Sequence, residues 1–91
     1  MSLKGKIVFI TGASSGIGAA TALAFAAEGA RLLLAARRAG KLAEVASKAL
    51  EQGAPAVHSI SLDVRNHRAV QQAIDDLPSE WAEIDVLVNN A

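Results

Sequence analysis

The 91-residue chain is long enough for one small domain, and its 52% hydrophobic and 20% charged residues exclude an intrinsically disordered protein. Nine Lys and Arg residues balance nine Asp and Glu residues, so a net charge of zero provides no basic surface for nucleic acid or an anionic membrane. The absence of cysteine excludes disulfides, thiolate nucleophiles and Cys-ligated metal sites. We therefore expect an ordered cytoplasmic protein that binds neither nucleic acid nor membranes.

The first half of the chain predicts two buried strands with a helix between them. Ile7–Thr11 is a continuous apolar run, which is typical of a strand buried on both faces of a parallel sheet, and residues 32–36 form a second such run. Between the two runs, helical spacing predicts a helix that ends in a left-handed cap at Gly29. The stripe predicted to be buried on this helix is Ile17, Ala20, Leu23, Ala24 and Ala27.

The second half of the chain repeats this alternation. Gly53 closes a second helix, whose predicted buried stripe is Leu42, Val45, Ala46, Ala49 and Leu50. Residues 57–62 alternate polar and apolar side chains, which suits a half-exposed edge strand, and residues 84–88 predict a fourth strand. Asn66 is a good N-cap for a third helix that Pro78 ends or bends, with the stripe Val70, Ala73, Ile74, Leu77 and Trp81.

The order of these elements is β-α-β-α-β-α-β, with a helix between each pair of strands. Such alternation implies right-handed crossovers and a parallel sheet. We predict an α/β fold with a Rossmann-type doubly wound sheet, here partial, in the strand order 3-2-1-4. No repeat or linker divides the chain, so residues 1–91 are expected to form one structural unit.

A glycine-rich turn with the spacing G-x-x-x-G-x-G joins the first strand to the first helix, through Gly12, Gly16 and Gly18. Glycine allows positive φ and lets a ligand approach the backbone, and the free N–H groups at a helix start favour an anion. Ser14 and Ser15 add hydroxyl donors. The turn therefore predicts a pyrophosphate site, although the same glycines would also suit a tight turn with close helix–sheet packing.

Three motifs in this order resemble the short-chain dehydrogenase/reductases. They follow the first, third and fourth predicted strands and read Thr11-Gly12-x-x-x-Gly16-Ile17-Gly18, Asp63-Val64 and Asn89-Asn90-Ala91. The resemblance covers the whole chain but only the N-terminal part of that family's fold. Residues 77–85 are also similar to a branch of the family that oxidises 3-hydroxy acids such as serine.

The resemblance implies a nicotinamide dinucleotide bound across the carboxyl ends of the strands. The residues implied to hold its pyrophosphate and the adjacent ribose are Gly12, Ser14, Ser15, Gly16, Ile17 and Gly18. Asp63 would accept a hydrogen bond from the adenine amino group, with Val64 beside the ring, unless Asp63 only caps the turn into the third helix. The resemblance also implies that Asn90 and Ala91 line the ribose side, while Asn89 ties the sheet together.

The residues after the second strand indicate which nicotinamide cofactor is bound. NAD enzymes place an acidic residue there to bind the ribose 2′-hydroxyl, but this chain has Ala36. Arg37 and Arg38 follow at once, and a guanidinium is a planar, permanently charged partner for a phosphate. We therefore predict NADP rather than NAD, although two arginines in such a loop could also be a solvated surface pair.

The chain contains no tyrosine, whereas the family resemblance implies a catalytic Ser, Tyr and Lys. No catalytic role is therefore assigned to any residue here, and no metal site is expected. We expect residues 1–91 to be the N-terminal part of a single dinucleotide-binding domain in a longer oxidoreductase. By resemblance, that enzyme transfers hydride to or from a small carbonyl or alcohol substrate as a homo-oligomer, either a tetramer or a dimer. The alternative is a non-catalytic dinucleotide-binding module, or a fragment that needs a partner.

Overall fold

Four parallel strands form the sheet, in the order β3-β2-β1-β4. This computed structural model describes residues 2–90. The predicted strand order and the alternation of strands and helices are both confirmed. The elements are β1 (Ile7–Thr11), α1 (Gly16–Ala27), β2 (Arg31–Ala36), α2 (Ala39–Gln52), β3 (Val57–Ser61), α3 (His67–Asp75), the 3-10 turn η1 (Ser79–Trp81) and β4 (Val86–Asn89).

The two central strands carry the core of the sheet. All five residues of β1 are buried, and in β2 every residue after Arg31 is buried, as expected for apolar runs covered on both faces. The outer strands β3 and β4 are only partly buried and alternate in exposure along much of their length. In register, Phe9 of β1 lies between Leu33 of β2 and Leu87 of β4.

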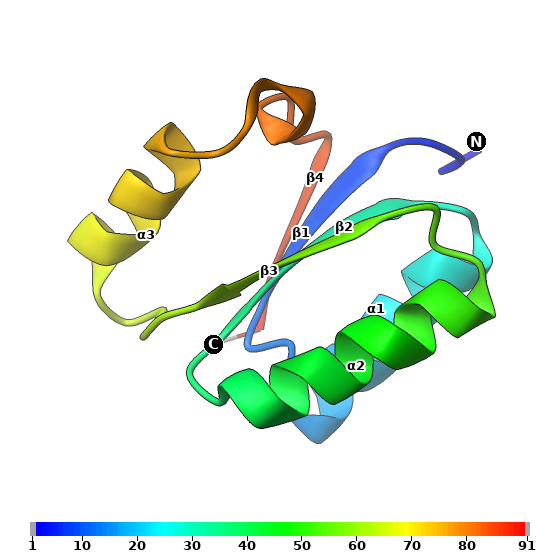
Figure 1. The fold of residues 1–91 in the computed structure, drawn as a ribbon, viewed down its shortest axis with the longest axis horizontal. Coiled ribbons are helices and arrows are strands. Elements are labelled where there is room, and N and C mark those ends of the chain that lie inside the picture. The colour runs from blue at the N-terminus through cyan, green and yellow to red at the C-terminus, as the bar shows by residue number, and fades with distance from the viewer. Residues whose placement is uncertain (1, 91) are drawn as a thin grey trace.

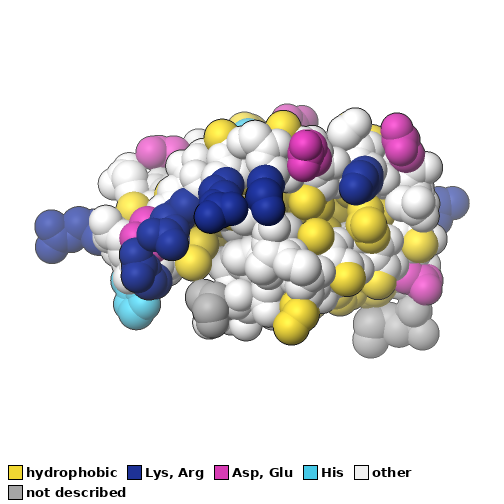
Figure 2. Space-filling model, turned by 90° about the horizontal axis from the view of Figure 1, so that it is seen from below, with side chains coloured by type: hydrophobic (Ala, Val, Ile, Leu, Met, Phe, Trp, Pro, Cys, Tyr) yellow, Lys and Arg dark blue, Asp and Glu magenta, His cyan; other side chains and the backbone are white. Residues whose placement is uncertain are grey.

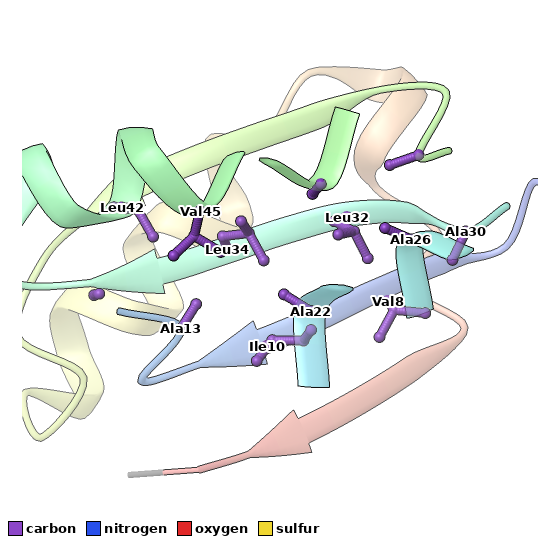
Figure 3. Packing of buried hydrophobic residues seen from close by; sticks show 13 residues of the cluster. Val8, Ile10, Ala13, Ala22, Ala26, Ala30, Leu32, Leu34, Leu42 and Val45 are labelled. Carbon is purple, nitrogen blue, oxygen red and sulfur yellow. The ribbon is translucent and has the colours of Figure 1, made fainter. Parts of the chain in front are cut away.

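Helices α1 and α2 cover one face of the sheet, whereas α3 and η1 lie on the other face (Figure 1). The core under α1 and α2 is built from leucine, isoleucine and valine side chains of the strands, which face alanines of α1 and the Leu42, Val45 and Ala49 side chains of α2 (Figure 3). Burying one such Leu or Ile side chain contributes about 1.5–3 kcal/mol, so this face supplies much of the apolar burial. Two of the alanines, Ala22 and Ala26, are fully buried.

The predicted buried stripe of α1 is wrong. Ile17 is 74% exposed, and the helix instead turns Gly18, Ala22 and Ala26 toward the core. The helix is apolar around its whole circumference, so periodicity could not select the inner face. Small residues on that face let the helix approach the sheet closely. In α2 the prediction fails at Leu50, which is 51% exposed.

The face under α3 is more thinly covered. None of the nine residues of α3 is buried, and the helix ends at Asp75, three residues before Pro78. The predicted stripe therefore breaks, and Trp81 reaches the core from η1. The centroid of its ring lies 5.8 Å from the centroid of the His58 ring. The guanidinium carbon of Arg31 lies 6.0 Å from the same Trp81 centroid.

Strand β4 begins two residues later than predicted because Asp85 pairs with the start of β1. The Asp85 carboxylate accepts the Ile7 N–H at 2.8 Å, and the Asp85 N–H donates to the Ile7 carbonyl at 2.9 Å. The predicted caps are present, with Gly29 at φ +79° and Gly53 at φ +126°. Among residues 2–90, no helix has the length and apolar character to cross a membrane.

Candidate functional site

A hollow of about 350 Å³ opens at the carboxyl ends of β1 and β2, beside the start of α1. It brings together segments that the sequence analysis placed on three separate strand ends. Seven of the predicted site residues line it, joined by Ala36 and by one residue that was not predicted, Lys41. The lining is Gly12, Ser14, Ser15, Gly16, Ala36, Arg37, Arg38, Lys41 and Val64.

The turn before α1 is fixed by the side chains of Ser15 and Asn90. The Ser15 hydroxyl donates to the Gly12 carbonyl at 2.9 Å and accepts the Gly18 N–H at 3.1 Å, so Ser15 is the N-cap of α1. The Asn90 amide donates to the Ser15 Oγ at 3.0 Å and to the Gly12 carbonyl at 3.4 Å. The Ser15 hydroxyl therefore holds the turn, whereas Ser14 lines the hollow and takes no part in these bonds.

The three glycines of the turn meet different surroundings. At Gly12, which has φ +64°, a Cβ would collide with the Asn90 carbonyl oxygen. At Gly18 it would collide with the Gly12 carbonyl and lie 2.8 Å from the Asn90 side-chain nitrogen. At Gly16 a Cβ would meet no described atom within 4 Å, and Gly16 lines the hollow. The packing of the chain requires the first two glycines, whereas Gly16 leaves bare backbone toward the open space.

The start of α1 offers donors to this space. The Gly18 N–H is taken by Ser15 Oγ and the Ala19 N–H by the Ser15 carbonyl, which leaves the N–H groups of Gly16 and Ile17 at the helix end. The first turn of α1 contains no acidic residue. The partial positive charge of the helix end and these two donors together form a site for an anion.

Thr11 joins this turn to the end of β4. Its hydroxyl donates to the Asn89 Oδ1 at 3.0 Å and accepts the Asn90 N–H at 3.1 Å. Asn89 therefore ties β4 to β1, as the resemblance implied. The Asn90 side chain holds the turn through its bond to the Ser15 Oγ and does not line the hollow. Ala91 lies outside the described residues.

A rim of positive charge closes the other end of the hollow. Arg37 and Arg38 follow β2 directly, and Lys41 stands in the first turn of α2. All three side chains belong to exposed residues, and Arg38 makes no side-chain cap bond to α2. Figure 2 shows Lys and Arg side chains gathered in a row on this side of the molecule. The sequence signal that could have found Lys41 is its place in the first turn of the helix that follows the two arginines.

Asp63 and Val64 follow β3 at the same end of the sheet. Val64 lines the hollow, whereas Asp63 lies beside it and binds Arg65. The side-chain and backbone hydrogen bonds from Arg65 lower the pKa of Asp63 from 3.8 to about 2, and the charge of Arg37 adds to this effect. The N-cap of α3 is Asn66, whose side chain accepts the Ala69 N–H at 3.1 Å. Asp63 caps the turn before this helix, as its alternative role predicted, because its Oδ1 accepts the Arg65 N–H at 3.0 Å and its carbonyl accepts the Asn66 N–H at 2.9 Å.

A second hollow, of about 250 Å³, lies between the sheet and α3. Its walls include the side chains of Phe9, Val70, Ile74 and Leu87, and it contains neither a glycine backbone nor a lysine or arginine. Such walls offer little to a phosphate. The remaining predicted residues, Ile17, Gly18 and Asp63, do not line either hollow.

The fold and the first hollow together define a Rossmann-type dinucleotide-binding unit, with a glycine-rich turn between β1 and α1 at the point where the strand order reverses. The sequence matches the short chain dehydrogenase family over residues 6–91. The chain therefore belongs to this family, which confirms the resemblance drawn from the three motifs.

Curated relatives are similar over almost the whole chain. It is 46% identical over 90 residues to 11-beta-hydroxysteroid dehydrogenase 1A of Arabidopsis thaliana, covering 99% of this chain and 26% of that protein. It is 43% identical over 90 residues to the NADP-dependent 3-hydroxy acid dehydrogenase of Schizosaccharomyces pombe, covering 98% and 35%. The chain thus spans between a quarter and a little over a third of these relatives, and identity does not single out the 3-hydroxy acid branch.

Solved structures agree closely with this fold. L-sorbose reductase from Gluconobacter frateurii, complexed with NADPH and L-sorbose, superposes with a TM-score of 0.88 at 39% identity, covering 100% of this chain and 35% of that one. An NAD+-bound xylitol dehydrogenase superposes with a TM-score of 0.89 at 34% identity and the same coverage. Among these solved structures of similar fold, one thus holds NADPH and another holds NAD+.

Proposed function

We propose that residues 1–91 are the NADP(H)-binding, N-terminal part of one Rossmann domain in a short-chain oxidoreductase. The observation that carries this proposal is the bare backbone of Gly16, which opens into a hollow with a basic rim. The packing of the described residues does not require a glycine at position 16, because a Cβ there would meet no other atom within 4 Å. A glycine at this position instead leaves room for a pyrophosphate to approach the backbone. The two remaining amide donors of the α1 start would bind its oxygens.

The 2′-phosphate of NADP would lie at the basic rim. Arg37, Arg38 and Lys41 supply three positive charges, and Ala36 supplies no carboxylate to bind the free 2′-hydroxyl of NAD. The NADPH in the sorbose reductase complex and the name of the fission yeast relative support this choice. Because a related structure holds NAD+, the charges at the rim are the stronger argument.

The remaining contacts follow the resemblance. Asp63 would accept from the adenine amino group with Val64 beside the ring, and Asn90 and Ala91 would border a ribose. When bound, the nicotinamide supplies or accepts the hydride in exchange with a small carbonyl or alcohol substrate. The catalytic tyrosine that the resemblance implies is not among these 91 residues. The role proposed for the residues named here is therefore to bind and orient the cofactor. The whole enzyme would work as a homo-oligomer, a tetramer or a dimer.

Titration of the chain with NADPH and NADH, followed by nicotinamide fluorescence, tests this function. Two charge-assisted contacts to the 2′-phosphate predict about 100-fold tighter binding of NADPH. Neutralising both arginines, as Arg37→Ser with Arg38→Ser, should remove most of this preference, whereas Arg68→Ser on exposed α3 should keep it. A preference for NADPH that survives the double substitution would contradict the assignment of the rim. Failure of the chain to bind either cofactor would contradict the proposed function.

A further inference from the structure

We propose that Arg65 is a positioning residue that sets the Asp63 carboxylate for the amino group of adenine, and thereby makes the site selective for the base. This inference rests on the proposed function, because it concerns the adenine end of the same nucleotide. Arg65 lies two residues after Asp63, in the loop between β3 and α3. It was not among the residues predicted from the sequence.

Arg65 grips the carboxylate at three points. Its Nε donates to the Asp63 Oδ1 at 3.1 Å, one terminal guanidinium nitrogen donates to Oδ2 at 3.0 Å, and its backbone N–H donates to Oδ1 at 3.0 Å. A carboxylate can accept about four hydrogen bonds, two at each oxygen. Oδ1 is therefore filled and Oδ2 keeps one free position, so the orientation of the group is fixed with one acceptor left.

The backbone bond belongs to the loop itself, because the Arg65 N–H and the Asp63 Oδ1 close an Asx-turn, whereas the two guanidinium bonds are additional to it. The Asn66 N–H donates to the Asp63 carbonyl at 2.9 Å, and the Asn66 side chain caps α3. The ion pair is open to solvent, since the Arg65 side chain is 71% exposed and that of Asp63 is 39% exposed. An exposed ion pair contributes little to stability. The bidentate geometry is thus better suited to orienting the carboxylate than to holding the fold.

An oriented, ionised carboxylate discriminates between purines. It accepts hydrogen bonds and cannot donate them, so it favours the amino group at position 6 of adenine over the carbonyl oxygen of hypoxanthine. At neutral pH the carboxyl is ionised with or without Arg65, since its ordinary pKa is 3.8. What Arg65 adds is a fixed orientation, and its hydrogen bonds also lower the pKa of Asp63 to about 2. Neither Asp63 nor Arg65 lines the hollow, but Val64, which lies between them in the sequence, does, so the carboxylate stands beside the space where the adenine would lie.

The test compares binding of NADPH with binding of its hypoxanthine counterpart, by nicotinamide fluorescence, in the chain and in two variants. One charged hydrogen bond predicts about tenfold tighter binding of NADPH by the unaltered chain. In Arg65→Gln the ratio should fall to about twofold, and Arg65→Lys should restore part of it. Arg68→Gln removes the same charge nearby without touching Asp63 and should leave the ratio unchanged.

Carbon-detected NMR of the Asp63 carboxyl supplies a second readout. In Arg65→Gln its pKa should rise from about 2 toward the ordinary 3.8, while Arg68→Gln should leave it low. If Arg65→Gln binds NADPH and keeps the full ratio, the positioning role of Arg65 is wrong while the proposed function stands. An equal loss in Arg68→Gln would also overturn it, as a general charge effect. If the unaltered chain binds neither nucleotide, the proposed function fails, and this inference fails with it.

Discussion

The two ends of the hollow are built in different ways. At the glycine end, the turn is made of backbone, held by the Ser15 and Asn90 side chains and by contacts that exclude a Cβ at two positions. At the basic end, exposed side chains of Arg37, Arg38 and Lys41 extend from a loop and from the first turn of a helix. The shape of the first end is set by packing and hydrogen bonds, whereas the character of the second end is set by its positive charges.

This difference separates shape from selectivity. The glycine end can bind any diphosphate of the right size, because its amide donors contact no group that distinguishes one nucleotide from another. At the basic end the carbonyls of Arg37 and Arg38 accept bonds from the Ser61 Oγ and the Leu42 N–H, but within the described residues their side chains and that of Lys41 make no hydrogen bond, so these side chains are free to select the cofactor. Substitutions of the packed residues at the glycine end, such as Gly18 and Asn90, should therefore change stability, while those of the side chains at the basic end should change cofactor preference alone.

The largest effect is expected at Gly18. In Gly18→Ala the new Cβ would collide with the Gly12 carbonyl, and neither backbone can yield without moving the turn. We expect the free energy of unfolding to fall by about 2–4 kcal/mol, measured by urea denaturation.

The matched control for Gly18→Ala is Gly16→Ala in the same turn. A Cβ there meets no described atom, so stability should be unchanged or rise by up to about 1 kcal/mol, since alanine favours the helix. NADPH binding should nevertheless weaken at least tenfold, because the Cβ would enter the opening. Equal destabilisation by the two substitutions would remove the distinction between packing glycines and the ligand-facing glycine.

A smaller effect is expected from Asn90→Ala. It removes the hydrogen bonds to the Ser15 Oγ and the Gly12 carbonyl, in a partly exposed region. We expect a loss of about 1–2 kcal/mol in the free energy of unfolding, with NADPH and NADH binding weakened to the same extent. Unequal weakening would show that Asn90 belongs to cofactor selection rather than to the fixed end.

Lys41 tests the basic end. Lys41→Gln should weaken NADPH binding about threefold and leave NADH binding and stability unchanged, since the side chain is exposed and its charge is screened by solvent. Lys48→Gln, further along the exposed face of α2, is the control and should affect neither cofactor. A loss of NADH binding in Lys41→Gln would place this lysine against the pyrophosphate instead.

The smallest effect is the pH dependence of Asp63. Its pKa is about 2 in the folded chain against an ordinary 3.8, so its stabilising contribution is complete above about pH 4 and is lost as the pH falls toward 2. Asp63→Asn should therefore lower the thermal midpoint slightly at pH 7, and the difference should shrink toward pH 2. A difference that stays constant across this range would show that the ion pair does not stabilise the fold.

The sequence predicted the glycine end better than the basic end. Glycine spacing after a buried strand is a backbone signal, and it located Gly12, Gly16 and Gly18 and the strand order around them. The cap bond from the Gly18 N–H to the Ser15 Oγ is local, but the sequence did not show that Asn90, 75 residues away, donates to the same hydroxyl. Long-range hydrogen bonds of this kind leave no local pattern.

Two other failures have physical causes. The inner face of α1 was misplaced because alanines surround the helix and only the close approach of Gly18, Ala22 and Ala26 to the sheet decides which face is buried. Lys41 and Arg65 were missed because neither belongs to a motif, although Arg65 lies two residues after Asp63 and Lys41 lies in the helix that follows the two arginines. Charge next to a recognised motif, at helical or turn spacing, is the signal that would have found them.

The most direct test of the account is to titrate the ¹⁵N-labelled chain with NADP+ and record the amide shifts. We predict the largest shifts at the N–H groups of Gly16 and Ile17, followed by those of Arg37, Arg38 and Lys41. The opposite result would be unmoved Gly16 and Ile17 amides together with the largest shifts in the hollow under α3, at Val70, Ile74 and Leu87. That outcome would contradict the claim that the start of α1 binds the pyrophosphate.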